Sequence, residues 1–531
     1  MLVFFKKNIP IELIIIIIFG IIIRVIAIFK LNIIHTDGVV YIQQARTLLS
    51  GDFSGIFSCE LAYFPLSTVF IAGAYLIVGD WLIAGHATSC VFGSAMLIPL
   101  AMIFRRFFER EIVFLGVATF SVLPFFVYLS VNVIKEPVFI FFITSGLYFF
   151  IRYLDEYKKY LLIYSSLCFV FGTWARVEGF LIIILAAIFI IIYSHKDKLR
   201  NLLLFLVLPA FGILSVFVIF LVSNNMPNME TLVLGKVFYD PTLGYGTLKK
   251  ALYSMAYFEE NPKNLFLKEA AGQIWLIGAG TLLRNMLRAL RYFFFFILLL
   301  GLKEACFSLK FDKRIVFLLS IAVAGLFVVY IFCLKFWWTD PRFYAGTVLI
   351  PSSLLICYGF KKILYLLENK LGLSLRLSLF LVVTAIFLIC LPKDLKEIDK
   401  GDRVYKDIGS EISKLEDNAN MIKIATSIER SRVISFYANY AFLSASDQMW
   451  CNKSRSFLWE FFDKDYEGFI EKVKKANIDY FLWEERFWLR GNFLFEGSEL
   501  DGYFDKIGEW YHPDTGNIVL YKTKKSVYPS S

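Results

Sequence analysis

The stretch "LIIIIIFGIII" (residues 13–23) contains no polar side chain and lies within an apolar segment of about residues 9–29. An α-helix needs about 20 consecutive apolar residues to cross the hydrocarbon core of a bilayer. Together with the other apolar segments, this one predicts a polytopic α-helical membrane protein with about eleven transmembrane helices. The predicted spans are residues 9–29, 82–104, 112–132, 137–153, 160–176, 179–194, 201–222, 288–302, 315–335, 343–360 and 375–392.

The composition supports this class, because 58% of the 531 residues are hydrophobic and 18% are aromatic. The first span has no small-residue cleavage site and contains Arg24, which favours a retained anchor over a removed signal peptide. Most of the eight cysteines lie alone in apolar segments, where they serve as small core residues. Cys59 and Cys451 lie in polar segments, so a disulfide between them stays open.

The formal charge of +10 does not indicate a nucleic-acid partner, because lysines and arginines gather in short loops between spans. Residues 65–79 are apolar but short. Counting them as a span would place "RRFFER" (residues 105–110) outside and invert the later loops. Reading them as an interfacial or re-entrant helix keeps the basic loops cytoplasmic, as the positive-inside rule requires. We therefore expect a multi-pass plasma-membrane protein with a cytoplasmic N-terminus.

This topology places three long segments outside: residues 30–81, 223–287 and 393–531. Residues 1–392 then form the transmembrane domain, with interfacial helices in its first external loop. In the last segment, "MIKIATS" (421–427) is typical of a buried strand and "IERSRVISFYANYA" (428–441) of a helix. A helix, a second strand and a closing strand, "GNIVLYKTK" (516–524), follow. We expect a small external α/β domain over residues 393–531.

Ionisable residues at the external boundary are the candidates for chemistry, because a charge near lipid is costly unless it is paired or functional. Asp37 precedes "GVVYIQQARTLL", so capping a helix that ends at Gly51 is an alternative to catalysis. Glu136 opens another helix beside Pro137, where it would favour the helix dipole and Lys135 would neutralise it. Two carboxylates on one face also suit a general base with a second acid or a metal ligand.

Two further external turns carry charge. "TWARVEGF" contains Arg176 and Glu178, which pair with each other or serve a ligand. "DPRFYAGTVLIP" (340–351) contains Arg342 and Tyr344, and an external arginine needs an anionic partner such as Asp340, a lipid headgroup or a substrate phosphate. Nucleotide-binding glycine loops, H-E-x-x-H and C-x-x-C are absent from the sequence, and its four histidines disfavour a histidine-rich metal site.

The order of these features resembles the GT-C class of membrane glycosyltransferases, in the branch of protein O-mannosyltransferases and lipid A aminoarabinose transferases. The resemblance rests on "RVIAIFKLNIIHTDGVVYIQQARTLLSGD" (24–52), "YFPL" (63–66), "IKEPVFIFF" (134–142) and "DPRFYAGTVLIP". Asp37, Tyr41, Ala45 and Gly51 fit the acidic residue and short helix of the family's first external loop. One departure is Gly38, which stands where many relatives carry a second acid.

The resemblance implies transfer of a sugar from a polyprenyl-phosphate donor, dolichyl or undecaprenyl, to a protein, lipid or glycan on the external face. Asp37 would then be the general base of an inverting reaction, and Glu136 would orient the acceptor or bind a divalent cation, with no other cofactor required. The donor phosphate would be held by Arg342 and Tyr344 with Arg176 or Lys135, and the substrates by His35, Tyr41 and Glu178. A flippase or transporter of a lipid-linked sugar and a non-catalytic membrane scaffold are the alternatives.

Overall fold

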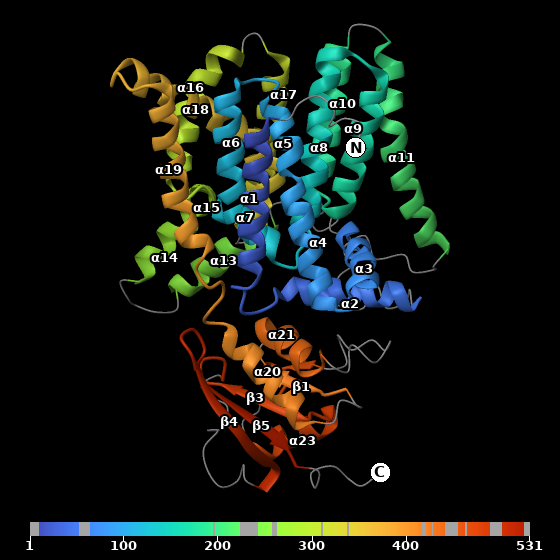
Figure 1. Cartoon of the computed structure of the whole chain (residues 1–531). Helices are drawn as coiled ribbons and strands as arrows, with labels where there is room; N and C mark the ends of the chain where they lie inside the picture. The colour runs from blue at the N-terminus through green and yellow to red at the C-terminus, as the bar shows by residue number, and fades with distance from the viewer. Residues whose placement is uncertain are drawn as a thin grey trace. The chain divides into compact units, whose positions relative to one another are not determined.

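The computed structural model of the chain consists mostly of α-helices, with a five-stranded sheet formed by C-terminal residues (Figure 1). It describes residues 10–51, 64–194, 197–222, 243–257, 263–309, 312–336, 339–416, 421–426, 428–440, 455–461, 465–488 and 502–524. Cys59 and Cys451 lie outside the described residues. The cysteines described as free thiols are Cys90, Cys168, Cys333, Cys357 and Cys390.

Each predicted span contains a helix. Within the described residues, six helices are long and apolar enough to cross a membrane, and two bent pairs raise the number to eight. This confirms the polytopic class, with fewer qualifying spans than the eleven predicted. The three predicted spans that do not qualify contain α9 (Lys159–Ala175), α10 (Gly179–Tyr193) and α11 (Lys198–Val222). The helices up to the sheet are α1 (Ile11–Ile28), α2 (Thr36–Ser50), α3 (Leu66–Val78), α4 (Trp81–Ala95), α5 (Leu97–Phe104), α6 (Arg110–Val122), α7 (Pro124–Val131), α8 (Glu136–Glu156), α9 (Lys159–Ala175), α10 (Gly179–Tyr193), α11 (Lys198–Val222), α13 (Leu243–Tyr257), α14 (Lys263–Gly272), α15 (Ile274–Ala289), α16 (Phe293–Leu309), α17 (Lys313–Phe336), α18 (Ile350–Asn369), α19 (Leu375–Asp394) and α20 (Arg403–Leu415).

The chain divides into two compact units. The membrane unit comprises residues 1–26, 89–130 and 135–395, and the loop–tail unit comprises residues 27–88, 131–134 and 396–531. The first external loop of the predicted topology therefore shares a unit with the C-terminal segment, although most of the chain separates them in sequence.

In the membrane unit, the buried Arg24 bonds the end of a helix that is interrupted at Leu123. Pro124 disfavours the helical conformation at Leu123, so α6 ends at Val122 and α7 continues at an angle of 50°. The last carbonyl groups of α6 then lack partners within their own helix. Arg24 of α1 supplies a donor for these carbonyl groups, since its Nη1 donates to the carbonyl oxygen of Ser121 at 2.7 Å. Its Nε also donates to the hydroxyl oxygen of Ser130 in α7, at 3.1 Å.

We expect Arg24→Leu to lower the stability of the membrane unit by about 1–3 kcal/mol, because buried carbonyl groups would lose their donor. The thermal unfolding midpoint of the detergent-purified protein measures this loss. Val25→Ala, on the exposed side of the same helix, is the matched control and should change the midpoint little. Equal midpoints for the two variants would contradict the capping role of Arg24.

Close helix contacts in the membrane unit depend on glycine. A Cβ atom on Gly301 of α16 would lie 1.8 Å from the carbonyl oxygen of Leu355, and one on Gly359 of α18 would lie 2.1 Å from that of Ile297. Reciprocal glycines thus let the α16 and α18 backbones approach each other, as small residues do between membrane helices.

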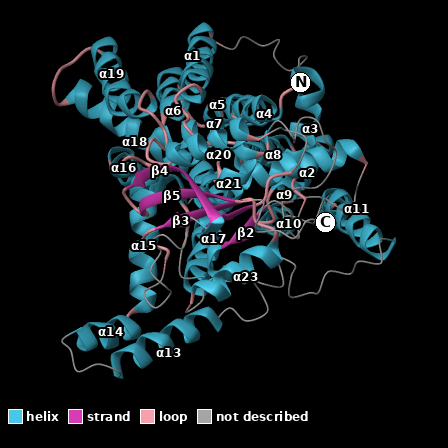
Figure 2. Ribbon diagram, turned by 90° about the horizontal axis from the view of Figure 1, so that it is seen from below, coloured by secondary structure: helices cyan, strands magenta, loops and turns pink. Residues whose placement is uncertain are grey.

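In the loop–tail unit, the strands, drawn in magenta in Figure 2, form one sheet. Its strand order is β2-β1-β3-β5-β4. The strands β1, β2 and β3 are parallel, whereas β3, β5 and β4 are antiparallel. The predicted strands and helices of the tail are confirmed, while α20, β2 and β4 were not predicted. The elements are β1 (Ile424–Thr426), α21 (Ile428–Ala438), β2 (Arg455–Phe457), a 3₁₀ helix (Leu458–Phe461), α23 (Tyr466–Ala476), β3 (Tyr480–Glu484), β4 (Phe504–His512) and β5 (Gly516–Thr523).

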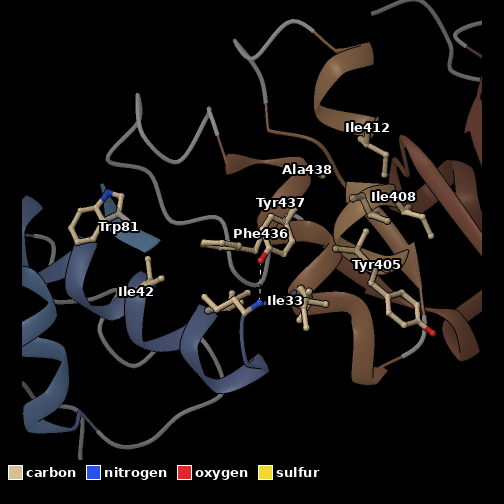
Figure 3. Close-up of a cluster of buried hydrophobic side chains, with 14 of the residues drawn as sticks. Ile33, Ile42, Trp81, Tyr405, Ile408, Ile412, Phe436, Tyr437 and Ala438 are labelled. Carbon is tan, nitrogen blue, oxygen red and sulfur yellow. Dashed lines mark hydrogen bonds between the residues drawn. The ribbon is translucent and has the colours of Figure 1, made fainter. Parts of the chain in front are cut away.

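Alternate side chains of the sheet enter two hydrophobic cores, as the period of two in a strand requires. Phe481 of β3 packs against α23, whereas Leu482 belongs to a larger core that α20 and α21 share with the first loop. Figure 3 shows this larger core, in which Ile33, Ile42 and Trp81 of the loop accompany the aromatic and aliphatic side chains of the tail. The loop and the tail of this unit therefore have a common interior.

Candidate functional site

Asp37 is the second residue of α2, in the loop–tail unit. His35 occupies the N-cap position, and its Nδ1 accepts a hydrogen bond from the Asp37 backbone N–H at 3.1 Å. The alternative in which Asp37 itself is the N-cap is therefore wrong, because α2 begins one residue before it. Gly51 does end the helix, with a left-handed φ of 76°. The Asp37 side chain is 30% exposed and lies 3.9 Å from His35 Nδ1.

The start of α2 has no room for a second acid. A Cβ atom on Gly38 would lie 2.6 Å from the carbonyl oxygen of Val133 and 2.8 Å from its Cβ atom. This contact gives a steric reason for a glycine at position 38. Tyr41, one turn further along, is 3% exposed and packs in the core of the loop–tail unit.

The first turns of α8 and α10 bring three predicted residues together in the membrane unit. Arg176 lies between α9 and α10, and its side chain is 4% exposed. It donates to Glu136 Oε1 through Nη1 and to both carboxylate oxygens of Glu178, the contact from Nε being 3.2 Å long. Glu136 is neutralised by Arg176, forty residues away in sequence, and the pairing of Arg176 with Glu178 takes place as well.

Arg176 keeps Glu178 ionised. Burial alone would raise the pKa of Glu178, but the guanidinium group of Arg176 outweighs it and lowers the pKa to about 2. Lys135 acts in the same direction at longer range. The turn therefore holds fixed charges at any physiological pH.

Arg342, more than 160 residues after Arg176 in the sequence, lies beside the same cluster. It lies in a 3₁₀ helix (Pro341–Tyr344) that leads through a π-helical turn (Ala345–Leu349) into α18. Asp340 caps this helix by accepting from the Arg342 backbone N–H at 2.9 Å, and it also lies 3.4 Å from Arg342 Nε. The same Nε lies 4.0 Å from Glu136 Oε1, and the Arg342 side chain is 16% exposed.

Phe343 connects the two arginines and was missed from the sequence. The Arg176 guanidinium carbon lies 4.9 Å from the centre of its ring, and that of Arg342 lies 5.9 Å away. The only sequence signal was its place between Arg342 and Tyr344. Tyr344 itself is fully buried.

The structure thus brings Glu136, Arg176, Glu178 and Arg342 together in the membrane unit, whereas His35, Asp37 and Tyr41 lie in the loop–tail unit. Across the described residues, no group of three or more histidine, cysteine, aspartate or glutamate side chains is placed to hold a metal ion. At Glu136, one carboxylate oxygen already pairs with Arg176.

Comparison with known proteins shows one family match and several structures of similar fold. Residues 64–222 match the family described as dolichyl-phosphate-mannose-protein mannosyltransferase, while no curated protein matches the chain. Among solved structures, the archaeal oligosaccharyltransferase AglB from Archaeoglobus fulgidus, in complex with an inhibitory peptide and a dolichol-phosphate, shares the fold. Its TM-score is 0.55 at 13% identity, over 97% of this chain and 75% of AglB. A second match is ArnT from Cupriavidus metallidurans bound to undecaprenyl phosphate, at 10% identity over 98% of this chain and 99% of the ArnT chain. Its TM-score is 0.46, which does not establish a common fold.

Proposed function

Since residues 64–222 belong to a glycosyltransferase family of the GT-C type, we propose that this protein transfers a sugar from a polyprenyl-phosphate donor to an acceptor on the external face of the membrane. The observation that carries the proposal is the family match, because the family's description names a dolichyl-phosphate-linked mannose. The AglB structure, of the same fold, is described with a dolichol-phosphate, which supports a polyprenyl lipid as the carrier.

We assign the donor phosphate to Arg342. A guanidinium group binds phosphate through two oxygens at once, and Arg342 is the more accessible of the two arginines in the cluster. Arg176 is less suited to this role, because Glu136 and Glu178 already accept its hydrogen bonds. Lys135 would add a second positive charge. Glu136 and Arg176 then act as positioning residues that fix the turn on which Arg342 packs.

Asp37 is the proposed general base. It would accept the proton of the acceptor hydroxyl or amine as that atom attacks the anomeric carbon. The bond from this carbon to the phosphate oxygen breaks with inversion, and Arg342 stabilises the charge on the departing polyprenyl phosphate. The partly exposed carboxylate of Asp37 is compatible with this role, and its fixed place in the first turn of α2 would orient it. His35, Tyr41 and Glu178 remain proposed substrate contacts.

The experiment is a transfer assay with the detergent-purified protein. Radiolabelled polyprenyl-phosphate sugars, beginning with dolichyl-phosphate mannose, are incubated with protein, lipid and glycan acceptors. Label in an acceptor supports the proposal. Movement of the intact donor across the membrane of a vesicle, without transfer of its sugar, would instead identify a flippase. If every donor gave neither transfer nor movement, the scaffold role would be the one left.

The Arg342 assignment makes its own prediction. Arg342→Ala should lower kcat/KM for the donor about 100-fold, since a charge-assisted phosphate contact contributes about 1.5–3 kcal/mol. Arg342→Lys should recover part of the loss. Arg314→Ala is the matched control, because Arg314 also pairs with an aspartate two residues before it, Asp312, yet lies away from the cluster in the sequence. Equal losses in the two alanine variants would refute the phosphate role.

A further inference from the structure

We propose that Tyr437, in the C-terminal segment (the tail, residues 396–531), is a positioning residue for Asp37, so that the tail is part of the catalytic apparatus. This inference rests on the proposed function for its kinetic consequence. Its structural part rests on hydrogen bonds and packing within the loop–tail unit alone.

The tail supplies several hydrogen bonds to the chain between α1 and α2. Leu31 and Ile398 form an isolated parallel β-bridge, in which the Asn32 N–H donates to the carbonyl oxygen of Ile398 at 3.2 Å. The Ile398 N–H donates in return to the carbonyl oxygen of Lys30 at 2.9 Å. The Asn32 side chain adds a bond of 2.9 Å to Ile398 O. The bridge fixes the segment five to seven residues before Asp37.

Tyr437 holds the same segment closer to Asp37. The backbone N–H of Ile34, three residues before Asp37, donates to the Tyr437 hydroxyl oxygen at 3.0 Å, as the dashed line in Figure 3 marks. Ile34 is 2% exposed and Tyr437 is 8% exposed, so water does not readily replace this bond. Burial raises the pKa of Tyr437 to about 12, so the hydroxyl stays neutral over the range of an enzyme assay.

Packing completes the constraint on the first turn of α2. Ile33 and Ile34 are buried in the core that they share with Tyr405, Phe436 and Tyr437. In the same turn, Gly38 lies against Val133 and Ile34, with no space for even a Cβ atom. The turn that carries Asp37 is therefore fixed by the close contact of Gly38 with the Val133 backbone and by the tail through Ile34.

This arrangement predicts a kinetic effect for a single oxygen atom. Tyr437→Phe keeps the ring and removes the acceptor of the buried Ile34 N–H, so the segment must shift to find another partner. Displacement of a catalytic group by about 1 Å costs up to about 100-fold in rate. We expect kcat to fall about 10- to 100-fold, with the KM values for donor and acceptor unchanged within about twofold.

The matched control is Tyr405→Phe. Tyr405 is fully buried in the same core, but its hydroxyl bonds Thr515 Oγ1 at 3.1 Å, within the tail itself. Both variants lose one buried hydroxyl contact and should lower the thermal midpoint by a similar amount. Only Tyr437→Phe should lower kcat. A fall in kcat of equal size in both variants, or an unchanged kcat in Tyr437→Phe, would overturn the proposal.

Two further readouts separate positioning from general destabilisation. In an Asp37→Asn background, Tyr437→Phe should cause no additional loss of the residual rate, because its effect passes through the Asp37 carboxylate. An additional loss of the full size would contradict the proposal. Backbone hydrogen exchange over residues 31–38 should accelerate in Tyr437→Phe and not in Tyr405→Phe. If the wild-type protein transferred no sugar, the proposed function would fail, and the exchange experiment would still decide whether Tyr437 holds this segment.

Discussion

Asp37→Asn should reduce sugar transfer about 10²- to 10⁴-fold, the contribution that a general base typically makes. Asparagine has the size of aspartate but cannot take the acceptor proton. The helix itself should persist, because its cap is the His35 side chain and not Asp37. Transfer rates at saturating donor, together with unchanged expression and thermal midpoint, are the measurements that check this expectation.

Glu467→Gln is the control for this prediction. Glu467 is, like Asp37, the second residue of a helix in the loop–tail unit, namely α23. The substitution removes the same first-turn charge without touching α2, so its transfer rate should equal that of the wild type. If Asp37→Asn kept more than about a tenth of the wild-type rate, below the smallest usual contribution of a base, Asp37 would be a first-turn carboxylate and nothing more.

Arg176→Met should have the largest effect on stability, a loss of about 3–5 kcal/mol. In the variant the buried carboxylate of Glu136, which is 2% exposed, loses its hydrogen-bonded cation and keeps Arg342, whose Nε lies 4.0 Å away. The double variant Arg176→Met with Glu136→Gln removes both charges of the buried pair and should recover part of the loss, since Glu178, 29% exposed, still lacks Arg176. Thermal midpoints and yields of folded protein from detergent extracts measure the difference.

A surface pair provides the comparison. Lys400 and Glu397 form an ion pair with side chains 77% and 44% exposed, and such pairs contribute about 0–1 kcal/mol. Lys400→Met should therefore change the midpoint little. Should Arg176→Met prove as stable as its double variant, the buried pair would have no structural role, and Arg176 would become available for a ligand.

The sequence was sufficient for the class of protein and for the helices of the membrane. Long apolar runs need nothing beyond their own composition to be recognised, and each predicted span contains a helix. The expectation of a membrane glycosyltransferase was confirmed by the family match over residues 64–222. That inference depended on the order of weak motifs along the chain, which survives low sequence identity.

Contacts between distant residues could not be predicted. Glu136 was expected to be neutralised by its neighbour Lys135, whereas Arg176 fills that role from a different helix turn. The N-cap of α2 was predicted at Asp37, whereas the structure has it two residues earlier, at His35. Histidine is an uncommon cap and aspartate a frequent one. The strand β4 was missed because its burial does not alternate cleanly along an edge of the sheet. Each miss concerns a choice that tertiary packing makes among locally acceptable alternatives.

The arginine in the first membrane helix has a consequence for biosynthesis. Its acceptors Ser121 and Ser130 follow it by 97 and 106 residues, so they do not yet exist when the ribosome has completed α1. Until then the acceptor within its own helix is the carbonyl oxygen of Gly20, at 2.9 Å from Nη1. An arginine near the centre of a bilayer costs about 2.5–3.5 kcal/mol on insertion scales. The first helix to be translated therefore completes its hydrogen bonding only after α6 and α7 have been made. A chain truncated before residue 120 would leave Arg24 without its acceptors on those two helices.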